Sequence, residues 1–207
     1  VLLALSFGIY EYHFRLAKKS YVRVAEHARE FAEEIGHRVG KDFPFIHVGT
    51  PYALQFHLQT LRPVVDSELA EQALRSEHAA YVLVRDSGKS DVNPGWDTAP
   101  FHEVLRWPSG TRQFFRILSN RPQLEVTSKV AFAVPDLLVE MDGMRLLRAT
   151  DRRLDFELVG ADGRVALTNK GNREQTVQLY VDDQGRTVTM ERLLAPDERW
   201  EWVPDRG

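Results

Sequence analysis

Cysteine is absent from the 207-residue sequence. Its absence excludes disulfide bonds, zinc sites built from thiolates and a cysteine nucleophile, and it leaves the redox compartment open. An excess of positive charge is also missing, because the formal net charge is −3 and the isoelectric point is about 6.2. We therefore expect no nucleic-acid partner.

Long hydrophobic runs are missing as well, although the first ten residues, VLLALSFGIY, are uncharged and mostly apolar. A transmembrane helix needs about 20 apolar residues, and a signal peptide needs a basic start and a small-residue cleavage site. We interpret residues 1–19 as the end of a transmembrane helix and a juxtamembrane segment, with Arg15, Lys18 and Lys19 just outside the bilayer. The alternative is a buried first helix.

Glycine-rich phosphate-binding loops are absent too. The segment HVGTPY ends a predicted strand and begins a predicted helix, but Gly49 stands alone and Pro51 removes one main-chain donor. Turn and helix-start chemistry is the favoured interpretation. The alternative is a ligand at the carboxyl ends of the strands, for which the candidate binding residues are Gly49, Thr50, Tyr52 and Asp86.

Residues 20–112 carry the pattern of an α/β domain. Apolar residues at three-to-four spacing predict an amphipathic helix over 20–39, a second helix from Pro51 to its stop at Pro63, and a third over 68–77, where Asp66 or Ser67 is the N-cap. Apolar runs predict strands over 43–48, 63–65 and 79–86. This alternation with short connections predicts a small Rossmann-like unit with a parallel sheet.

Residues 113–207 have a different sequence pattern. Short runs such as FFRILSN, LLVEM, RVALTN and TVQLYV are separated by turn signals, among them Asp142-Gly143 and Asp162-Gly163. Strands at this spacing predict a second domain that is an antiparallel β-sandwich. The expected fold class is therefore α/β plus all-β, in that order along the chain.

A catalytic or metal-binding set of side chains is not recognisable. The seven histidines include no pair at a spacing that would place two ligands on one face, so we expect no metal site. No Gly-x-Ser-x-Gly elbow occurs. The carboxylate pairs Glu33-Glu34, Asp182-Asp183 and Asp136 with Glu140 fit a solvated helix, a hairpin and strand alternation. Trp200 and Trp202 favour packing over a sugar-stacking platform.

One stretch carries a resemblance. The sequence FPFIHVGTPYALQFHLQTLRPVVDSELAEQALRSEHAAYVLVRD, after a helix that leaves a membrane segment, resembles the soluble C-terminal region of GT-C membrane glycosyltransferases. That group includes the protein mannosyltransferases and the lipid A aminoarabinose transferases. The features that match are Val48-Gly49, the Leu54–Leu58 run, Val64-Val65, Glu68-Leu69 and the YVLV strand. His57 stands where the family usually has an aromatic residue. The later region, from VALTNKG to LAPDERWEW, resembles adhesion-type sandwiches.

The resemblance implies a membrane enzyme that transfers a sugar from a polyprenyl-phosphate donor on the extracytoplasmic side. It places the domain on the periplasmic face of an inner or plasma membrane, with its own upstream transmembrane part and a lipid-linked sugar or glycan acceptor as partners. The family's acidic catalytic residues lie among membrane helices, so no catalytic residue and no cofactor is expected in this chain. A divalent metal would belong to the membrane part.

Two other functions fit the sequence. The chain is alternatively a membrane-anchored binding or scaffold module whose β-sandwich presents a surface to a glycan or a protein. A third hypothesis is a free-standing α/β enzyme with a ligand near Gly49, Thr50 and Asp86. The number of hydrophobic spans upstream of Val1 would distinguish these hypotheses.

Overall fold

A computed structural model describes residues 20–49, 52–86, 100–107, 114–159, 162–183 and 185–204. The expected membrane-helix end and juxtamembrane segment, residues 1–19, lie outside these ranges, as does Thr50. Within the described ranges, no helix combines the length and the apolar character needed to cross a membrane.

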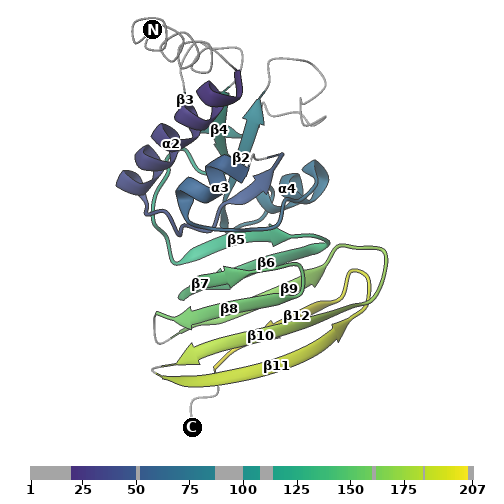
Figure 1. Cartoon of the computed structure of the whole chain (residues 1–207). Coiled ribbons are helices and arrows are strands. Elements are labelled where there is room, and N and C mark those ends of the chain that lie inside the picture. Colours follow the sequence, from purple (N-terminus) through teal and green to yellow (C-terminus); the bar gives the residue numbers. More distant parts are fainter. Residues whose placement is uncertain are drawn as a thin grey trace, which may run out of the picture.

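Helices cluster in the first part of the chain (Figure 1). They are α2 (Ser20–Arg38), α3 (Tyr52–Leu58) and α4 (Ser67–Leu74). Asp66 is the N-cap of α4, since its Oδ1 accepts from Leu69 N–H at 2.8 Å. The second helix was predicted to run to Pro63 and is shorter, because Gln59 adopts a positive φ of 57° and ends the helix.

The first sheet is built around β2 (Ala79–Asp86). On one side β2 pairs in parallel with β1 (Ile46–Val48), which in turn forms a parallel bridge from His47 to Val64. On the other side it pairs antiparallel with β4 (Phe114–Ser119), and β4 pairs with β3 (His102–Trp107). The sequence placed β4 in the second domain and did not predict β3, yet both strands extend the sheet of the first unit.

The remaining strands form a region of two sheets (Figure 1). One sheet has the order β12-β9-β6-β5 and joins β2 through a short parallel pairing of Ala79 and Ala80 with β5; the other has the order β11-β10-β8-β7. The bounds are β5 (Lys129–Val134), β6 (Leu137–Asp142), β7 (Met144–Ala149), β8 (Arg153–Leu158), β9 (Arg164–Asn169), β10 (Gln175–Asp183), β11 (Arg186–Leu194) and β12 (Arg199–Trp202).

The prediction of an antiparallel arrangement in the C-terminal region holds only in part. β10 pairs with β8 in parallel, and β2 pairs with β5 in parallel, so both sheets are mixed. The reason is the connection: β9, between β8 and β10 in the chain, belongs to the other sheet, so β10 returns beside β8 in the same direction. Such a crossover cannot be read from the strand pattern alone.

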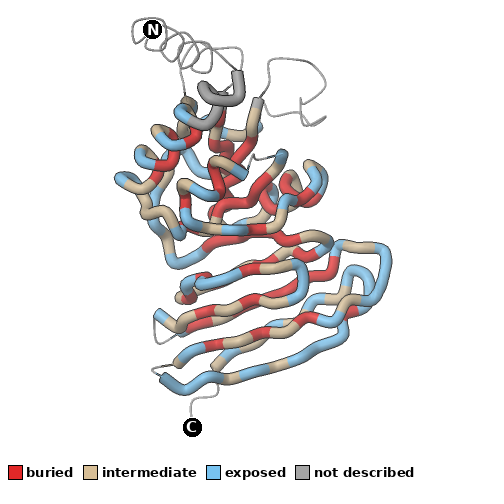
Figure 2. Tube along the Cα trace, viewed as in Figure 1, coloured by how far each residue is buried: buried red, intermediate tan, exposed pale blue. Residues whose placement is uncertain are grey.

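Two buried clusters lie on opposite faces of the first sheet. Alternate β2 residues divide between them: Val82 and Val84 face α4 and the β5–β6 sheet, whereas Tyr81 and Leu83 face α2 and α3. The first cluster continues between the two C-terminal sheets. Buried residues therefore run from the helical part into the β region without a break (Figure 2), and β11 is mostly exposed.

Candidate functional site

The predicted ligand residues lie at the carboxyl ends of β1 and β2. Gly49 directly follows β1 and has a φ of +59°, and Asp86 ends β2. Because Val48 is in register with Val84, their main chains reach the same edge of the parallel pair. Tyr52 begins α3 and its side chain is 81% exposed. Thr50 and the side chain of Asp86 lie outside the described part, so only Gly49 and Tyr52 are fully placed.

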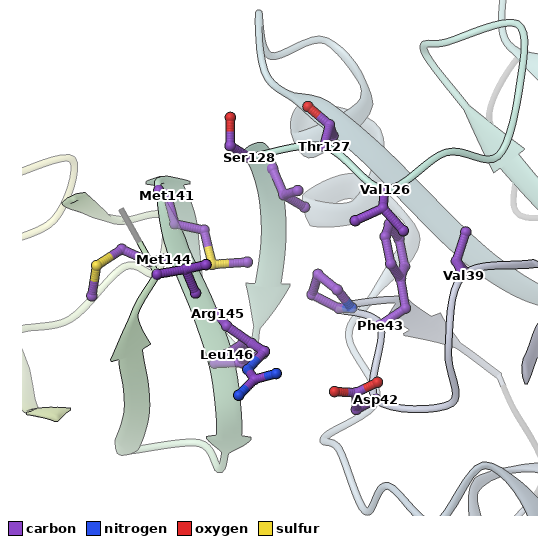
Figure 3. A pocket seen from close by; sticks show the side chains of 14 residues that line it. Val39, Asp42, Phe43, Val126, Thr127, Ser128, Met141, Met144, Arg145 and Leu146 are labelled. Atoms are coloured by element: carbon purple, nitrogen blue, oxygen red, sulfur yellow. The ribbon is translucent and has the colours of Figure 1, made fainter. Parts of the chain in front are cut away.

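A groove of about 450 Å³ opens elsewhere, between the helical part and the C-terminal sheets. Its apolar walls come from the segment after α2 (Val39, Phe43), the approach to β5 (Val126, Val130) and the β6–β7 corner. At that corner Met141, Met144 and Leu146 line the groove (Figure 3). The size lies within the range of pockets that hold small ligands.

Two charged side chains stand at the edge of this groove. Asp42 and Arg145 come from opposite walls (Figure 3). Arg145 donates through Nε to Glu157 at 2.7 Å, so its charge is already paired within the C-terminal sheet. Asp42 is exposed, and its main-chain oxygen accepts from Arg62. The groove thus combines an apolar interior with polar ends. The sequence did not reveal it because its walls are distant in the chain.

A polar network connects the end of α4 with β6. Ser76 Oγ donates to Glu140 Oε1 at 2.7 Å, and His78 Nε2 lies 3.2 Å from Asp142 Oδ1. Arg199 and Arg164 bind the same two carboxylates. Burial alone would raise the pKa of Glu140, but the hydrogen bonds from Arg199 and Ser76 outweigh it and lower this pKa.

This network has a structural role. The Ser76 hydroxyl donates to Glu140 and accepts from the main-chain N–H of His78, so the imidazole does not activate it as a general base would. The contacts hold the turn before β2 against β6. Arginine residues from β9 and β12 form ion pairs with the same two carboxylates. From the sequence, Glu140 was interpreted as part of simple strand alternation, so this role was not predicted.

An exposed apolar face lies on α3 and the chain after it. Tyr52 and Phe56, four residues apart and so on one side of the helix, are 81% and 78% exposed, and Leu61 is 79% exposed. Val64 is also largely exposed. Of the apolar residues whose spacing predicted this helix, Leu54 and Leu58 pack in the core. Contiguous exposed apolar side chains are typical of interaction surfaces.

The other candidate residues have structural roles. Trp200 and Trp202 are partly buried against the first core cluster, which agrees with packing. Asp182 accepts from Gly185 N–H in the β10–β11 turn, as a hairpin residue does. Among the described residues, no three His, Asp or Glu side chains are grouped so that they would hold a metal ion.

Comparisons with known proteins were made at three levels. No family model, no curated protein and no solved structure matches this chain.

Proposed function

We propose that this chain is the extracytoplasmic part of an integral-membrane glycosyltransferase that uses a polyprenyl-phosphate sugar donor. In this proposal the catalytic residues lie in the membrane part, on the periplasmic side of an inner or plasma membrane. The chain itself contributes a Rossmann-like unit that covers the membrane part and a β-sandwich that extends away from it. It does not catalyse transfer alone.

The arrangement of the first unit supports this proposal. The parallel order of the Val64 bridge, β1 and β2, with α3 and α4 as connections, has the alternation of a small Rossmann-like unit. It lies in the stretch whose sequence resembles the soluble part of GT-C enzymes. Fold-level likeness is an analogy and assigns no residue to chemistry.

The exposed face of α3 carries the proposal. Tyr52, Phe56 and Leu61 present large apolar surfaces to solvent within one short segment. Aromatic side chains with one polar end, such as Tyr52, suit the boundary between an apolar and an aqueous phase. A membrane-embedded partner domain would remove this surface from water and would gain roughly 25 cal/mol per Å² of apolar area.

Photo-crosslinking in the full-length membrane protein tests this assignment. A benzophenone amino acid at Phe56 should crosslink to the membrane part, and the same probe at Leu193, an exposed apolar position on β11, should not. In proteoliposomes with polyprenyl-phosphate-linked hexoses, the full-length protein should consume the donor and the 207-residue chain should not. A single upstream hydrophobic span, or no crosslink at Phe56, would overturn the proposal.

A binding module is the second candidate function. The observation in its favour is the apolar groove between the two parts, with Asp42 and Arg145 at its ends. Native mass spectrometry against a set of glycans and amphiphiles would test it. Binding that is lost in Val126→Trp, a substitution at an exposed residue of the groove wall, would support the module, and retained binding would reject this groove as the site.

A further inference from the structure

The strand β7 has one open edge. It is the last strand of its sheet and, among the described strands, it pairs with β8 alone. Within the described ranges, no main-chain hydrogen bond joins its other edge to a further segment. An edge strand presents a row of N–H and C=O groups that can pair with another strand. An extended segment can therefore be added to this sheet at β7.

The apolar groove runs beside this open edge. Met144, Arg145 and Leu146 form the regular first half of β7, and all three line the groove (Figure 3). The irregularity in register comes after Leu146, so it does not disturb this half. Phe43 and Val126 lie across the groove from these residues (Figure 3). The open edge thus borders about 450 Å³ of space instead of another part of the described chain.

The inner side of β7 favours an apolar neighbour. Met144 and Leu146 are 7% and 2% exposed, and they share one side of the strand because alternate residues face the same way. Val126 and Val159, which also line the groove, are 73% and 67% exposed. An added strand would place every second side chain on this apolar side. Those residues should therefore be apolar.

The outer side of β7 is cationic. Arg145 and Arg148 are both exposed. Arg145 is paired with Glu157 of β8, whereas Arg148 has no ion pair among the described residues. Opposite charges directly across two strands stabilise a sheet, and like charges destabilise it. The outward-facing residues of an added strand should therefore be acidic.

The strand β8 shows that β7 accepts this alternation on its other edge. Its residues Leu154–Leu158, with the sequence LDFEL, alternate between apolar and acidic side chains. The first two apolar residues are fully buried, while Asp155 and Glu157 lie in register with Arg148 and Arg145. Both edges of β7 share the same side chains, so a strand of the same alternation suits the open edge as well.

We propose that the open edge of β7 binds an extended partner segment in which apolar and acidic residues alternate. The main chain of the segment pairs with β7, its apolar side chains enter the groove, and its acidic side chains meet Arg145 and Arg148. This inference rests on the second candidate function, the binding module, and names the partner of that module. It is independent of the glycosyltransferase assignment. An amphiphile would use the groove without the strand edge.

Titration of the 207-residue chain with synthetic peptides tests the site. The probe RLDFELV has the sequence of residues 153–159, and RLKFKLV is its charge-reversed control. Fluorescence anisotropy should show saturable binding of one RLDFELV per chain, about tenfold tighter than RLKFKLV. Equal affinity for the two peptides, or no saturable binding of RLDFELV, would overturn the inference.

Dodecyl maltoside, below its critical micelle concentration, separates this failure from failure of the binding module. Binding of the detergent with no binding of the peptide would keep the groove as a site and reject the strand partner. If neither probe binds, the peptide inference fails and the binding module loses its support as well.

Backbone methylation of the probe separates strand pairing from side-chain contact. One peptide carries N-methyl groups on the leucines and the phenylalanine of RLDFELV, and a second carries them on its two acidic residues. In a paired strand, successive N–H groups point to opposite edges. One of the two peptides should therefore lose binding and the other should retain it. An equal effect of both methylation patterns contradicts strand addition.

Charge variants locate the bound peptide. Arg148→Glu should weaken binding of RLDFELV about tenfold and strengthen binding of RLKFKLV. Arg186→Glu is the matched control, at an exposed arginine on β11 at the opposite end of the same sheet, and should leave both affinities unchanged. Val126→Trp, in the groove wall, should also weaken binding of RLDFELV. Equal effects of the two charge variants would mean that net charge attracts the peptide, which contradicts a site at β7.

Discussion

The helical first unit and the C-terminal β region satisfy their polar groups differently. Every buried side-chain nitrogen or oxygen without a hydrogen bond, among the described residues, precedes β5; His47, Gln55, Arg62 and Gln72 are examples. Charge pairs occur in both regions, as in Arg75 with Glu71 in the first unit and Arg145 with Glu157 in the β region. The two regions thus differ in where buried hydrogen bonds stay unmet: among the described residues these lie in the first unit.

The exposed apolar residues follow the same division. Tyr52, Phe56, Leu61 and Val64 lie on α3 and the segment after it, whereas Leu147 and Leu193 of the β region lie on different strands. Isolated exposed apolar residues are ordinary, but a cluster indicates a covered surface. From this contrast we expect the first unit to carry the larger interaction surface.

The largest expected effect tests whether the two regions unfold together. Phe156→Ala removes a fully buried ring that contacts Phe132 at a centroid distance of 6.4 Å, and it should cost about 3–5 kcal/mol. Phe115→Ala, which removes the ring stacked on Phe31, is its counterpart in the first unit.

Calorimetry and denaturant unfolding check this prediction. If the shared strand pairing of β2 and β5 makes one cooperative unit, both variants lower a single transition. Leu193→Ala, at an exposed position, is the control and should change stability by less than about 0.5 kcal/mol. Two transitions, each sensitive to one variant only, would show that the regions are independent.

The second prediction concerns Asn169, a buried and hydrogen-bonded polar residue of the β region. Asn169 is fully buried; its Nδ2 donates to the carbonyls of Arg173 and Leu194, and its Oδ1 accepts from Gly171 N–H. Asn169→Ala leaves these main-chain groups unpaired and should cost about 2–4 kcal/mol. Asn172→Ala, in the exposed part of the same turn, should be nearly neutral. Equal losses would mean that the amide network is unimportant.

The third prediction concerns His47, a buried histidine of the first unit, and the dependence of stability on pH. His47 has a pKa of about 3 in the folded chain against 6.5 ordinarily, so below pH 6.5 the unfolded chain binds a proton that the folded chain does not. Stability is therefore full above pH 6.5 and falls as the pH falls toward 3, by about 2 kcal/mol between pH 6.5 and 5.

Urea unfolding at several pH values measures this loss. His47→Leu should remove most of it and flatten the pH dependence, because the variant has no imidazole to protonate. His37→Leu, at an exposed position on α2, serves as the matched control and should retain the wild-type slope. The same slope in wild type and His47→Leu would contradict the assigned burial effect.

Local signals made parts of this fold predictable. The strand AAYVLVRD is a continuous apolar run and is β2, and Asp66 is the N-cap that its position before an apolar helix suggested. Non-local events were not predictable. The pairing of β4 with β2, although β3 lies between them in the chain, and the parallel pairing of β8 with β10 depend on which strands meet in space.

The candidate sites divide in the same way. Gly49 and Asp86 were placed at a common edge, since carboxyl ends of parallel strands coincide. The burial of Arg62 was not foreseen, because a lone arginine after a helix is usually solvated. Nor was the network of Glu140, whose partners Ser76 and Arg199 lie 64 and 59 residues away.

The smallest expected effect concerns an exposed charge pair of the β region. Arg145 on β7 binds Glu157 on β8, but both side chains remain substantially exposed, so water and salt weaken their attraction. Arg145→Ala should cost only about 0.2–1 kcal/mol. Arg148→Ala, an exposed arginine on the same strand, is the matched control and should cost less.

A double-mutant cycle of Arg145→Ala with Glu157→Ala isolates the pair from other losses. Because the interaction is exposed, its coupling energy should fall further in 1 M salt, where screening acts over about 3 Å. A coupling above about 2 kcal/mol that persists in salt would mean that the pair is effectively buried at the groove. In that case Arg145 would belong to the groove itself, and the expectation that the first unit carries the larger interaction surface would no longer hold.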